Sequence, residues 1–203
     1  AVKQLGLKGA MIHGLSCGKM IDEREFWPIF EVAEELDVPI YLHPADPDKT
    51  VTERYYSPYD KSHPMVTRAA WGFGIETGTQ AVRLILSGIF DRHPKLKIFL
   101  GHFGEAIPFW LPRIHESFAR PGNEHIDFKR IFKENFWITT SGFFSDNALE
   151  LCLKVLNAEK ILFAVDWPYA NNKVGVDWLA NAPIDTHTKK MIFSENAQNL
   201  FNL

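Results

Sequence analysis

The chain has 203 residues, of which 46% are hydrophobic and 23% charged, so it can bury one sizeable core and is predicted to form a single domain over residues 1–203. Its formal net charge of -3, without a clustered Lys/Arg face, disfavours nucleic acid or an anionic membrane as a partner and favours a small-molecule ligand. The two cysteines lie far apart and no apolar run reaches the roughly 18 residues of a bilayer span, so we expect a reduced, cytoplasmic protein with no membrane segment.

Five short apolar runs predict strands that are buried on both faces. They are residues 9–13 (GAMIH), 39–43 (PIYLH), 97–101 (KIFLG), 136–141 (FWITTS) and 161–166 (ILFAVD). Helical patterns lie between and after them, at about residues 22–36, 66–90, 105–118, 148–156, 176–180 and 186–201. Strands that alternate with helices predict parallel strands joined by right-handed crossovers, so the expected fold class is α/β.

The α/β class leaves a choice between an open doubly wound sheet and a (β/α)₈ barrel. The segment GLSCGK at 14–19 lacks the glycine spacing of a phosphate-binding loop, which disfavours a nucleotide-binding sheet. Ionisable residues at the ends of several strands favour the barrel. A barrel needs eight strands and about 250 residues. The five units therefore predict the C-terminal part of a barrel whose N-terminal strands are missing from this sequence.

Three of the predicted strands deliver an ionisable side chain at or just after their carboxyl ends: His43, His102 and Asp166. Parallel strands bring these ends together, so we expect a shared site. His43 is followed by Pro44 and is a candidate for a metal or catalytic role. Asp166 follows five apolar residues, and a buried carboxylate there must be paired, hydrogen-bonded or bound to a metal.

His102 and Glu105 belong to the segment GHFGE at 101–105. We expect Gly101 and Gly104 to let the backbone turn tightly, and Glu105 to open the next helix and hold the His102 imidazole in one tautomer. The alternative is a helix-capping glutamate beside a structural histidine. One imidazole and one carboxylate suit Zn²⁺ or Mn²⁺, with at least one further ligand still to be found.

Other histidines are weaker candidates. His13 ends the first strand and is a candidate substrate contact, whereas exposure to solvent is expected for His93, His115, His125 and His187. The long connection at 46–64 is rich in tyrosine, proline and charge, and it is a candidate cover for the site.

Five stretches together carry a specific resemblance: FWPIFEVAEELDVPIYLHPADP, ETGTQAVRLILSGIFDRHPKLKIFLGHFGEAIPFWLPRI, FWITTSG, ILFAVDWPY and FSENAQNLF. Through them essentially the whole chain resembles the amidohydrolase-related family of γ-resorcylate, 2,3-dihydroxybenzoate and 5-carboxyvanillate decarboxylases, with aminocarboxymuconate semialdehyde decarboxylase as a relative. The resemblance implies a distorted TIM barrel in which His43 and Asp166 ligate a divalent metal and His102 with Glu105 forms a dyad beside the substrate.

The implied reaction is the metal-dependent, non-oxidative decarboxylation of a small hydroxyaromatic or unsaturated carboxylic acid, with release of CO₂. Asp166 is implied as the proton donor, and His102 as the group that orients the phenol or shuttles its proton. Phe103, Phe143 and Trp167 are candidates to pack on an aromatic ring, although core packing explains each equally well. The family's first-strand motif, Glu-x-His or His-x-His, has no counterpart here, so we expect this chain alone to bind metal poorly.

Two other functions stay open at this point. One is a metal-dependent hydrolase of a lactone or amide on the same scaffold, with Asp166 taking the proton. The other is a catalytically silent barrel remnant that serves in binding or oligomerisation. Barrels of this kind commonly pack through exposed apolar helices, so a homodimer or homotetramer is expected.

Overall fold

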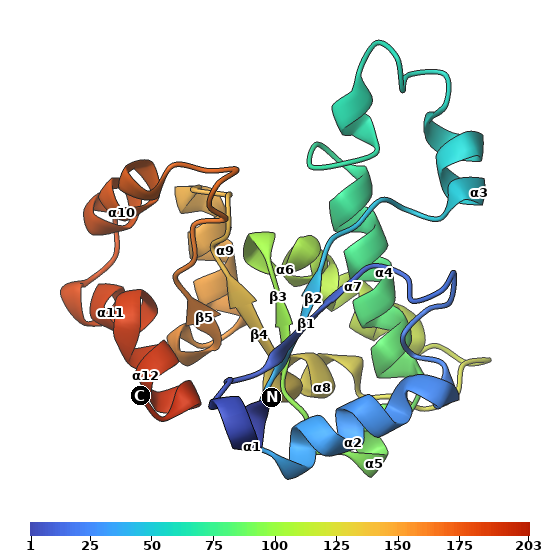
Figure 1. The fold of residues 1–203 in the computed structure, drawn as a ribbon, viewed down its shortest axis with the longest axis horizontal. Helices are drawn as coiled ribbons and strands as arrows, with labels where there is room; N and C mark the ends of the chain where they lie inside the picture. Colours follow the sequence, from blue (N-terminus) through green and yellow to red (C-terminus); the bar gives the residue numbers. More distant parts are fainter.

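The computed structural model describes all 203 residues, and its centre is one sheet of five parallel strands (Figure 1). The strands are β1 (Ala10–His13), β2 (Ile40–His43), β3 (Ile98–Leu100), β4 (Phe136–Thr139) and β5 (Ile161–Leu162). Each strand pairs with the next along the chain, in the order β1-β2-β3-β4-β5. This is the order of a barrel wall, because a doubly wound sheet reverses its order at a switch point. The predicted strands and the α/β class are confirmed.

Helices connect the strands and cover one face of the sheet (Figure 1). The α-helices are α1 (Val2–Leu5), α2 (Trp27–Glu35), α3 (Lys49–Val51), α4 (Gly72–Leu86), α5 (Ile89–Arg92), α6 (His102–Glu105), α7 (Ile107–Phe118), α8 (Phe128–Asn135), α9 (Asp146–Val155), α10 (Asn172–Asn181), α11 (Thr186–Lys190) and α12 (Asn196–Phe201). Short 3₁₀ or π turns lie at Arg24–Phe26, Thr52–Tyr56, Pro64–Val66, Ala158–Lys160 and Met191–Glu195. None of these helices has the length and apolar character needed to cross a membrane.

Two helix predictions need correction. The single helix expected at 66–90 is divided, because Gly88 takes a left-handed backbone conformation (φ 80) between α4 and α5. Helix α8 was not expected, although Phe128, Ile131, Phe132 and Asn135 follow helical spacing and all four are buried.

The two faces of the sheet differ in composition. The outer face, defined by Ile40, Leu42, Ile98, Leu100, Phe136, Ile138 and Ile161, belongs to the apolar core shared with the helices. The inner face carries the alternate residues, defined by Met11, His13, Tyr41, His43, Phe99, Trp137 and Thr139, which the strand register places side by side. Phe99 contacts Tyr41 and Trp137 on either side, with ring centroids 6.0 and 6.3 Å apart. The prediction of strands buried on both faces is confirmed for β3 and β5. It is wrong for the inner face elsewhere, where Tyr41, His43 and Trp137 are only half-buried.

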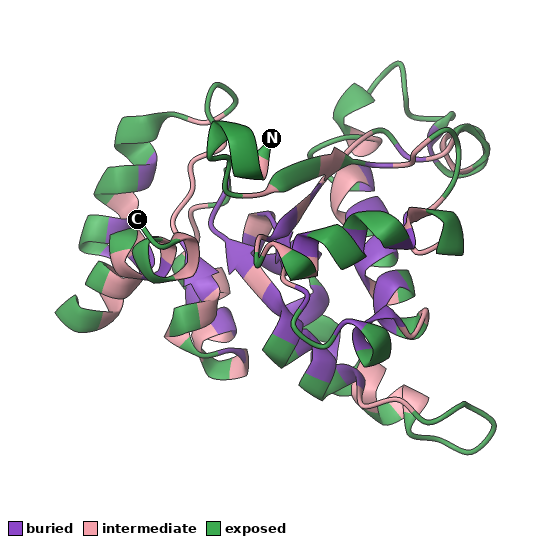
Figure 2. Cartoon of the chain, turned by 60° about the horizontal axis from the view of Figure 1, so that its bottom comes forward, coloured by how far each residue is buried: buried purple, intermediate pink, exposed green.

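Strand β1 also differs from its prediction. Ala10, Met11 and His13 are exposed, and Met11 retains 51% of its accessible surface. The physical reason is that β1 is an edge strand, paired only with β2, so its inner face lacks the packing that the central strands have. Figure 2 shows burial concentrated in the central strands and the helices that face them.

The connection after β2 does not fold over the strand ends. The segment that contains α3 projects beyond the sheet beside α4 (Figure 1). Its exposed aromatic residues include Tyr55 and Tyr59. The expectation that this connection covers the site is therefore not met in this structure.

Candidate active site at the strand ends

Two histidines lie side by side on the inner face, at the carboxyl ends of β1 and β2. His13 and His43 are register partners, and their ring centroids are 4.4 Å apart. The Nδ1 of His43 lies 2.7 Å from the carbonyl oxygen of Pro44. A carbonyl only accepts, so Nδ1 carries the proton and Nε2 keeps a free lone pair, as in a metal-binding histidine. Burial, and then the neighbouring His43 ring, lower the pKa of His13.

The short element α6, together with Ala106, is a left-handed turn and not a regular α-helix, and it follows β3 after Gly101. Every residue from 102 to 106 has a positive φ, between 46 and 81°. Only one of the five is a glycine, so the turn is sterically costly and belongs to the strained backbone that proteins keep at functional sites. The turn puts residues 102 and 105 on one side, where His102 Nδ1 donates to Glu105 Oε1 over 2.6 Å.

This geometry favours the dyad over the capping alternative. Glu105 is buried and binds the imidazole, and helix α7 begins two residues later, so the expectation that Glu105 opens that helix is wrong. The expectation that Gly101 is needed for a tight backbone turn is also wrong. Its φ of −73° is open to any residue, so the tight turn does not require a glycine there. A Cβ at Gly101 would instead lie 2.9 Å from the Tyr41 hydroxyl, so the glycine provides space.

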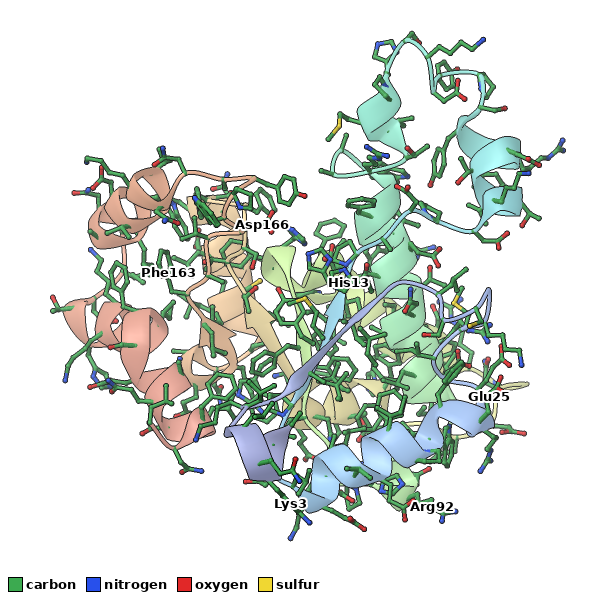
Figure 3. All side chains as sticks on the ribbon, viewed as in Figure 1. Lys3, His13, Glu25, Arg92, Phe163 and Asp166 are labelled. Atoms are coloured by element: carbon green, nitrogen blue, oxygen red, sulfur yellow. The ribbon has the colours of Figure 1, made fainter.

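Asp166 approaches His102 from the edge of the sheet that β5 forms. Strand β5 ends at Leu162, earlier than predicted, but the chain stays tied to the end of β4: Gly142 N–H donates to Val165 O, and Thr140 Oγ1 donates to Ala164 O. These bonds bring Asp166 Oδ2 to 3.9 Å from His102 Nε2. Figure 3 shows Asp166 and His13 toward the same end of the sheet.

His102 therefore lies between two carboxylates. Burial lowers the pKa of His102, but the hydrogen bond to Glu105 and the charges of Glu105 and Asp166 outweigh it, so the pKa lies above its ordinary value. An imidazole in this position can hold a proton on Nε2 and exchange it with a neighbouring group.

Two side chains near the strand ends have donor atoms of the kind that bind divalent metals. The free Nε2 of His43 and the half-buried carboxylate of Asp166 are ligand types that Zn²⁺ and Mn²⁺ accept. No group of three or more His, Cys, Asp or Glu side chains in the structure is arranged to hold a metal ion. His43 and Asp166 thus carry donor types that a divalent site uses, and no third such donor is grouped with them.

The aromatic candidates lie in different surroundings. Phe103 is buried and contacts Phe143 and Trp178 edge to face, with centroids 5.8 and 6.2 Å apart, which favours core packing over substrate contact. Trp167 is 73% exposed beside Asp166 in the chain. Among the other histidines, the expectation of exposure is wrong for His93, which is buried and bonded through Nδ1 to Glu34 at 3.0 Å.

Sequence reasoning missed three hydroxyl groups close to this site. The Tyr41 hydroxyl lies 3.1 Å from Thr139 Oγ1 and 3.3 Å from Ser141 Oγ. The signal was present as polar residues inside otherwise apolar strands, in PIYLH and FWITTS. Burial raises the pKa of Tyr41, and the charges of Glu105 and Asp166 add to this effect against the hydrogen bonds from Ser141 and Thr139. The phenol therefore stays neutral.

A cavity of about 450 Å³ lies elsewhere and contains none of the candidate site residues. It is lined by Trp137, Glu159, His187, Met191, Glu195, Asn196, Asn199 and Leu200. The candidate site is therefore defined by its ionisable side chains and not by this cavity.

A family model described as amidohydrolase matches residues 1–203. The chain belongs to the amidohydrolase family. This amidohydrolase chain is 37% identical, over 213 residues, to the γ-resorcylate decarboxylase of Polaromonas sp., and the match covers 100% of this chain and 64% of the relative. The resemblance predicted from the sequence is confirmed.

Solved structures of decarboxylases also resemble this chain. The dihydroxybenzoic acid decarboxylase of Polaromonas sp., crystallised with manganese and the inhibitor 2-nitroresorcinol, matches with a TM-score of 0.91 and 38% identity over 100% of this chain and 63% of that one. The 5-carboxyvanillate decarboxylase of Sphingomonas paucimobilis matches with a TM-score of 0.90 and 38% identity over 100% of this chain and 60% of that one. This amidohydrolase chain thus spans about 64% of the length of its curated relatives, in agreement with five βα units of a longer barrel.

Proposed function

We propose that the protein is a metal-dependent, non-oxidative decarboxylase of a small hydroxyaromatic carboxylic acid. The observation that carries the proposal is the position of His102, bonded to Glu105 and 3.9 Å from Asp166 at the carboxyl ends of the strands. Relatives at 35–38% identity are named as decarboxylases of resorcylate and dihydroxybenzoate. Because the chain spans about 64% of those relatives, the activity is proposed for the protein to which it belongs.

The side chains supply a proton path. Decarboxylation of an aromatic acid adds a proton to the ring carbon that bears the carboxylate, then breaks the carbon–carbon bond so that its electron pair returns to the ring and CO₂ leaves. We assign the proton to Asp166 in its acid form. His102 restores that proton from Nε2, since its raised pKa keeps it charged over a wider pH range. Glu105 holds the ring so that Nε2 faces Asp166.

His43 and Asp166 would hold the metal, with Zn²⁺ and Mn²⁺ as the candidates. When bound, a divalent ion would fix the substrate carboxylate and stabilise negative charge on the neighbouring phenolic oxygen. Two protein ligands hold a divalent ion poorly, so we infer that further ligands would be needed to complete the site. A cytoplasmic location and assembly as a homodimer or homotetramer complete the proposal. His13 and Trp167 remain proposed substrate contacts.

An activity panel tests the proposal. The protein to which the chain belongs is purified and loaded with Mn²⁺ or Zn²⁺. It is then incubated with dihydroxybenzoates, carboxyvanillate, and a set of lactones and amides. We expect CO₂ release from at least one hydroxyaromatic acid and no hydrolysis. Hydrolysis of a lactone or amide with solvent oxygen in the product, and no CO₂ from any acid, would replace the decarboxylase by the hydrolase. Inactivity on every compound despite stoichiometric metal would favour the catalytically silent remnant.

A further inference from the structure

Three hydroxyl groups form a closed cluster on the inner face, directly below the strand ends. Tyr41 comes from β2, whereas Thr139 and Ser141 come from β4 and the residues after it, so the cluster bridges across the intervening strand β3. Thr139 and Ser141 are buried, and their oxygens are 2.7 Å apart. With the contacts of 3.1 and 3.3 Å to Tyr41, three O–H donors meet three short contacts, so each hydroxyl can be satisfied within the cluster.

Gly101 makes this bridge possible. Tyr41 must pass over the end of β3 to reach Thr139, and the space it uses is the one that a side chain at Gly101 would fill. The position of a Cβ at Gly101 is 2.9 Å from the Tyr41 hydroxyl and 3.6 Å from Glu105 Oε1. The hydroxyl of Tyr41 and the carboxylate of the dyad therefore share the space over one glycine.

The remaining sides of Glu105 are also closely packed. Its Oε2 lies 3.1 Å from the position of a Cβ at Gly74 in α4, and its carbonyl oxygen lies 3.0 Å from the same position at Gly78. Helix α4 thus closes one side of the Glu105 side chain. The Tyr41 hydroxyl and Glu105 Oε1 both border the same point beside Gly101, so a shift of the phenol would change the space next to Oε1.

We propose that Tyr41, Thr139 and Ser141 are positioning residues for the His102–Glu105 dyad. Thr139 and Ser141 fix the Tyr41 hydroxyl, and the fixed phenol keeps Glu105 Oε1 on the Nδ1 proton of His102. The three residues act through Glu105 and are assigned no direct step in the reaction. The effect on turnover rests on the proposed function, whereas the effect on the Nδ1 proton does not.

Proton NMR of the protein reads the dyad directly. The His102 Nδ1 proton, in a 2.6 Å bond to a carboxylate, should resonate far downfield, and its loss in His102→Asn assigns it. In Tyr41→Phe we expect the resonance to move upfield and its exchange with solvent to become about five- to tenfold faster, the effect of roughly one hydrogen bond. Thr139→Val should do the same and Thr139→Ser, which keeps the hydroxyl, should restore the wild-type signal.

Controls separate positioning from general damage. Tyr59→Phe, in the exposed segment after β2, should leave the resonance unchanged. Tyr41→Phe combined with Thr139→Val should have a smaller effect than the sum of the two single changes, because both break the contact between Tyr41 and Thr139. Additive effects, or a resonance that does not move in either single variant, would show that the cluster only packs the sheet. Ser141→Ala provides an independent variant if Tyr41→Phe fails to fold.

Turnover separates this inference from the proposed function. On an accepted acid, Tyr41→Phe should lower kcat by about tenfold and leave KM within about twofold, since substrate contacts are kept. Altered resonances in a protein that decarboxylates nothing would leave the positioning role standing and overturn the proposed function. If the protein is an active decarboxylase but Tyr41→Phe leaves both the resonance and kcat unchanged, the positioning role would be overturned and the proposed function would stand.

Discussion

The outer face of the sheet is lined by isoleucine, leucine and phenylalanine that pack against helices, whereas the inner face of the same strands carries tyrosine, threonine and histidine. In β2 the two types alternate residue by residue: Leu42 is 1% exposed in the core, and its neighbours Tyr41 and His43 point to the candidate site. Because strand side chains alternate between faces, one segment of four residues serves both the core and the site.

For a residue in these strands, the face on which its side chain lies determines whether a substitution affects stability or activity. A substitution on the outer face should reduce stability, and one on the inner face near the strand ends should reduce activity. The following predictions test that separation, beginning with the largest expected effect.

Among changes that keep Asp166, the largest effect is expected for His102→Asn. Loss of a group that exchanges protons should lower kcat by roughly 10² to 10⁴, the usual range for one general acid or base. The free energy of unfolding should change little, because His102 lies at the mouth of the site and not in the apolar core. His125→Asn, on an exposed loop, is the matched control and should keep wild-type kcat. Equal loss of activity in the two variants would contradict the role of His102.

Adjacent residues in β2 provide the sharpest stability comparison. Leu42→Ala should lower the free energy of unfolding by about 2 to 5 kcal/mol, since it leaves a cavity in the outer-face core. Tyr41→Phe keeps the ring and removes one hydroxyl, so its cost should be about 1 kcal/mol. Urea unfolding monitored by fluorescence measures both. Equal losses in the free energy of unfolding would contradict the assignment of stability to the outer face.

Metal binding should be weak in the isolated 203-residue chain. His43 and Asp166 supply two donors, and no group of three is present, so dialysis against a slight excess of Mn²⁺ or Zn²⁺ should leave clearly less than one ion per chain. Elemental analysis provides the measurement. A tightly held, stoichiometric ion that disappears in His43→Ala would show that the inner face completes a ligand set that the present geometry does not contain.

The smallest effect concerns a buried carboxylate outside the site. Glu76 in α4 is 6% exposed, and its Oε1 has no hydrogen-bond partner. Burial raises the pKa of Glu76; Asp48 acts in the same direction, and Gln80 and Arg83 act in the opposite one. The folded state therefore holds this proton more tightly than the unfolded state does. The contribution of Glu76 to stability is greatest below its unfolded pKa and decreases as pH rises toward the folded value.

Glu76→Gln removes this dependence. The variant should have a higher urea midpoint than the wild type at pH 7 to 8, and the difference should disappear near pH 4. Glu31→Gln, exposed on α2, should show no such difference. A Glu76→Gln midpoint below that of the wild type at neutral pH would mean that the carboxylate has a stabilising partner.

Much of the fold could be predicted from local patterns. All five strands follow from apolar runs ended by turn residues, and the approach of Asp166 to His102 follows from their places after the ends of parallel strands. The failures have non-local causes. His93 is buried because Glu34, 59 residues earlier, accepts its hydrogen bond. The left-handed turn at 102–106 goes against the backbone preferences of four of its five residues, so no propensity predicts it.

The hydroxyl cluster is an intermediate case. Tyr41 and Thr139 stand out as polar residues in apolar strands, but their meeting depends on space over Gly101 that only the folded chain defines. The role of Gly101 also depends on the folded chain. The sequence suggests a turn residue, whereas in the structure Gly101 leaves space for the Tyr41 hydroxyl.

The central claim is that Asp166, supplied by His102, protonates the ring carbon that loses CO₂. Decarboxylation in D₂O tests it most directly, with the product examined by mass spectrometry and NMR. The account predicts one deuteron on the carbon that carried the carboxylate, and no such labelled product with Asp166→Asn even if the variant retains metal. Formation of the deuterated product at the wild-type rate in Asp166→Asn would contradict the account.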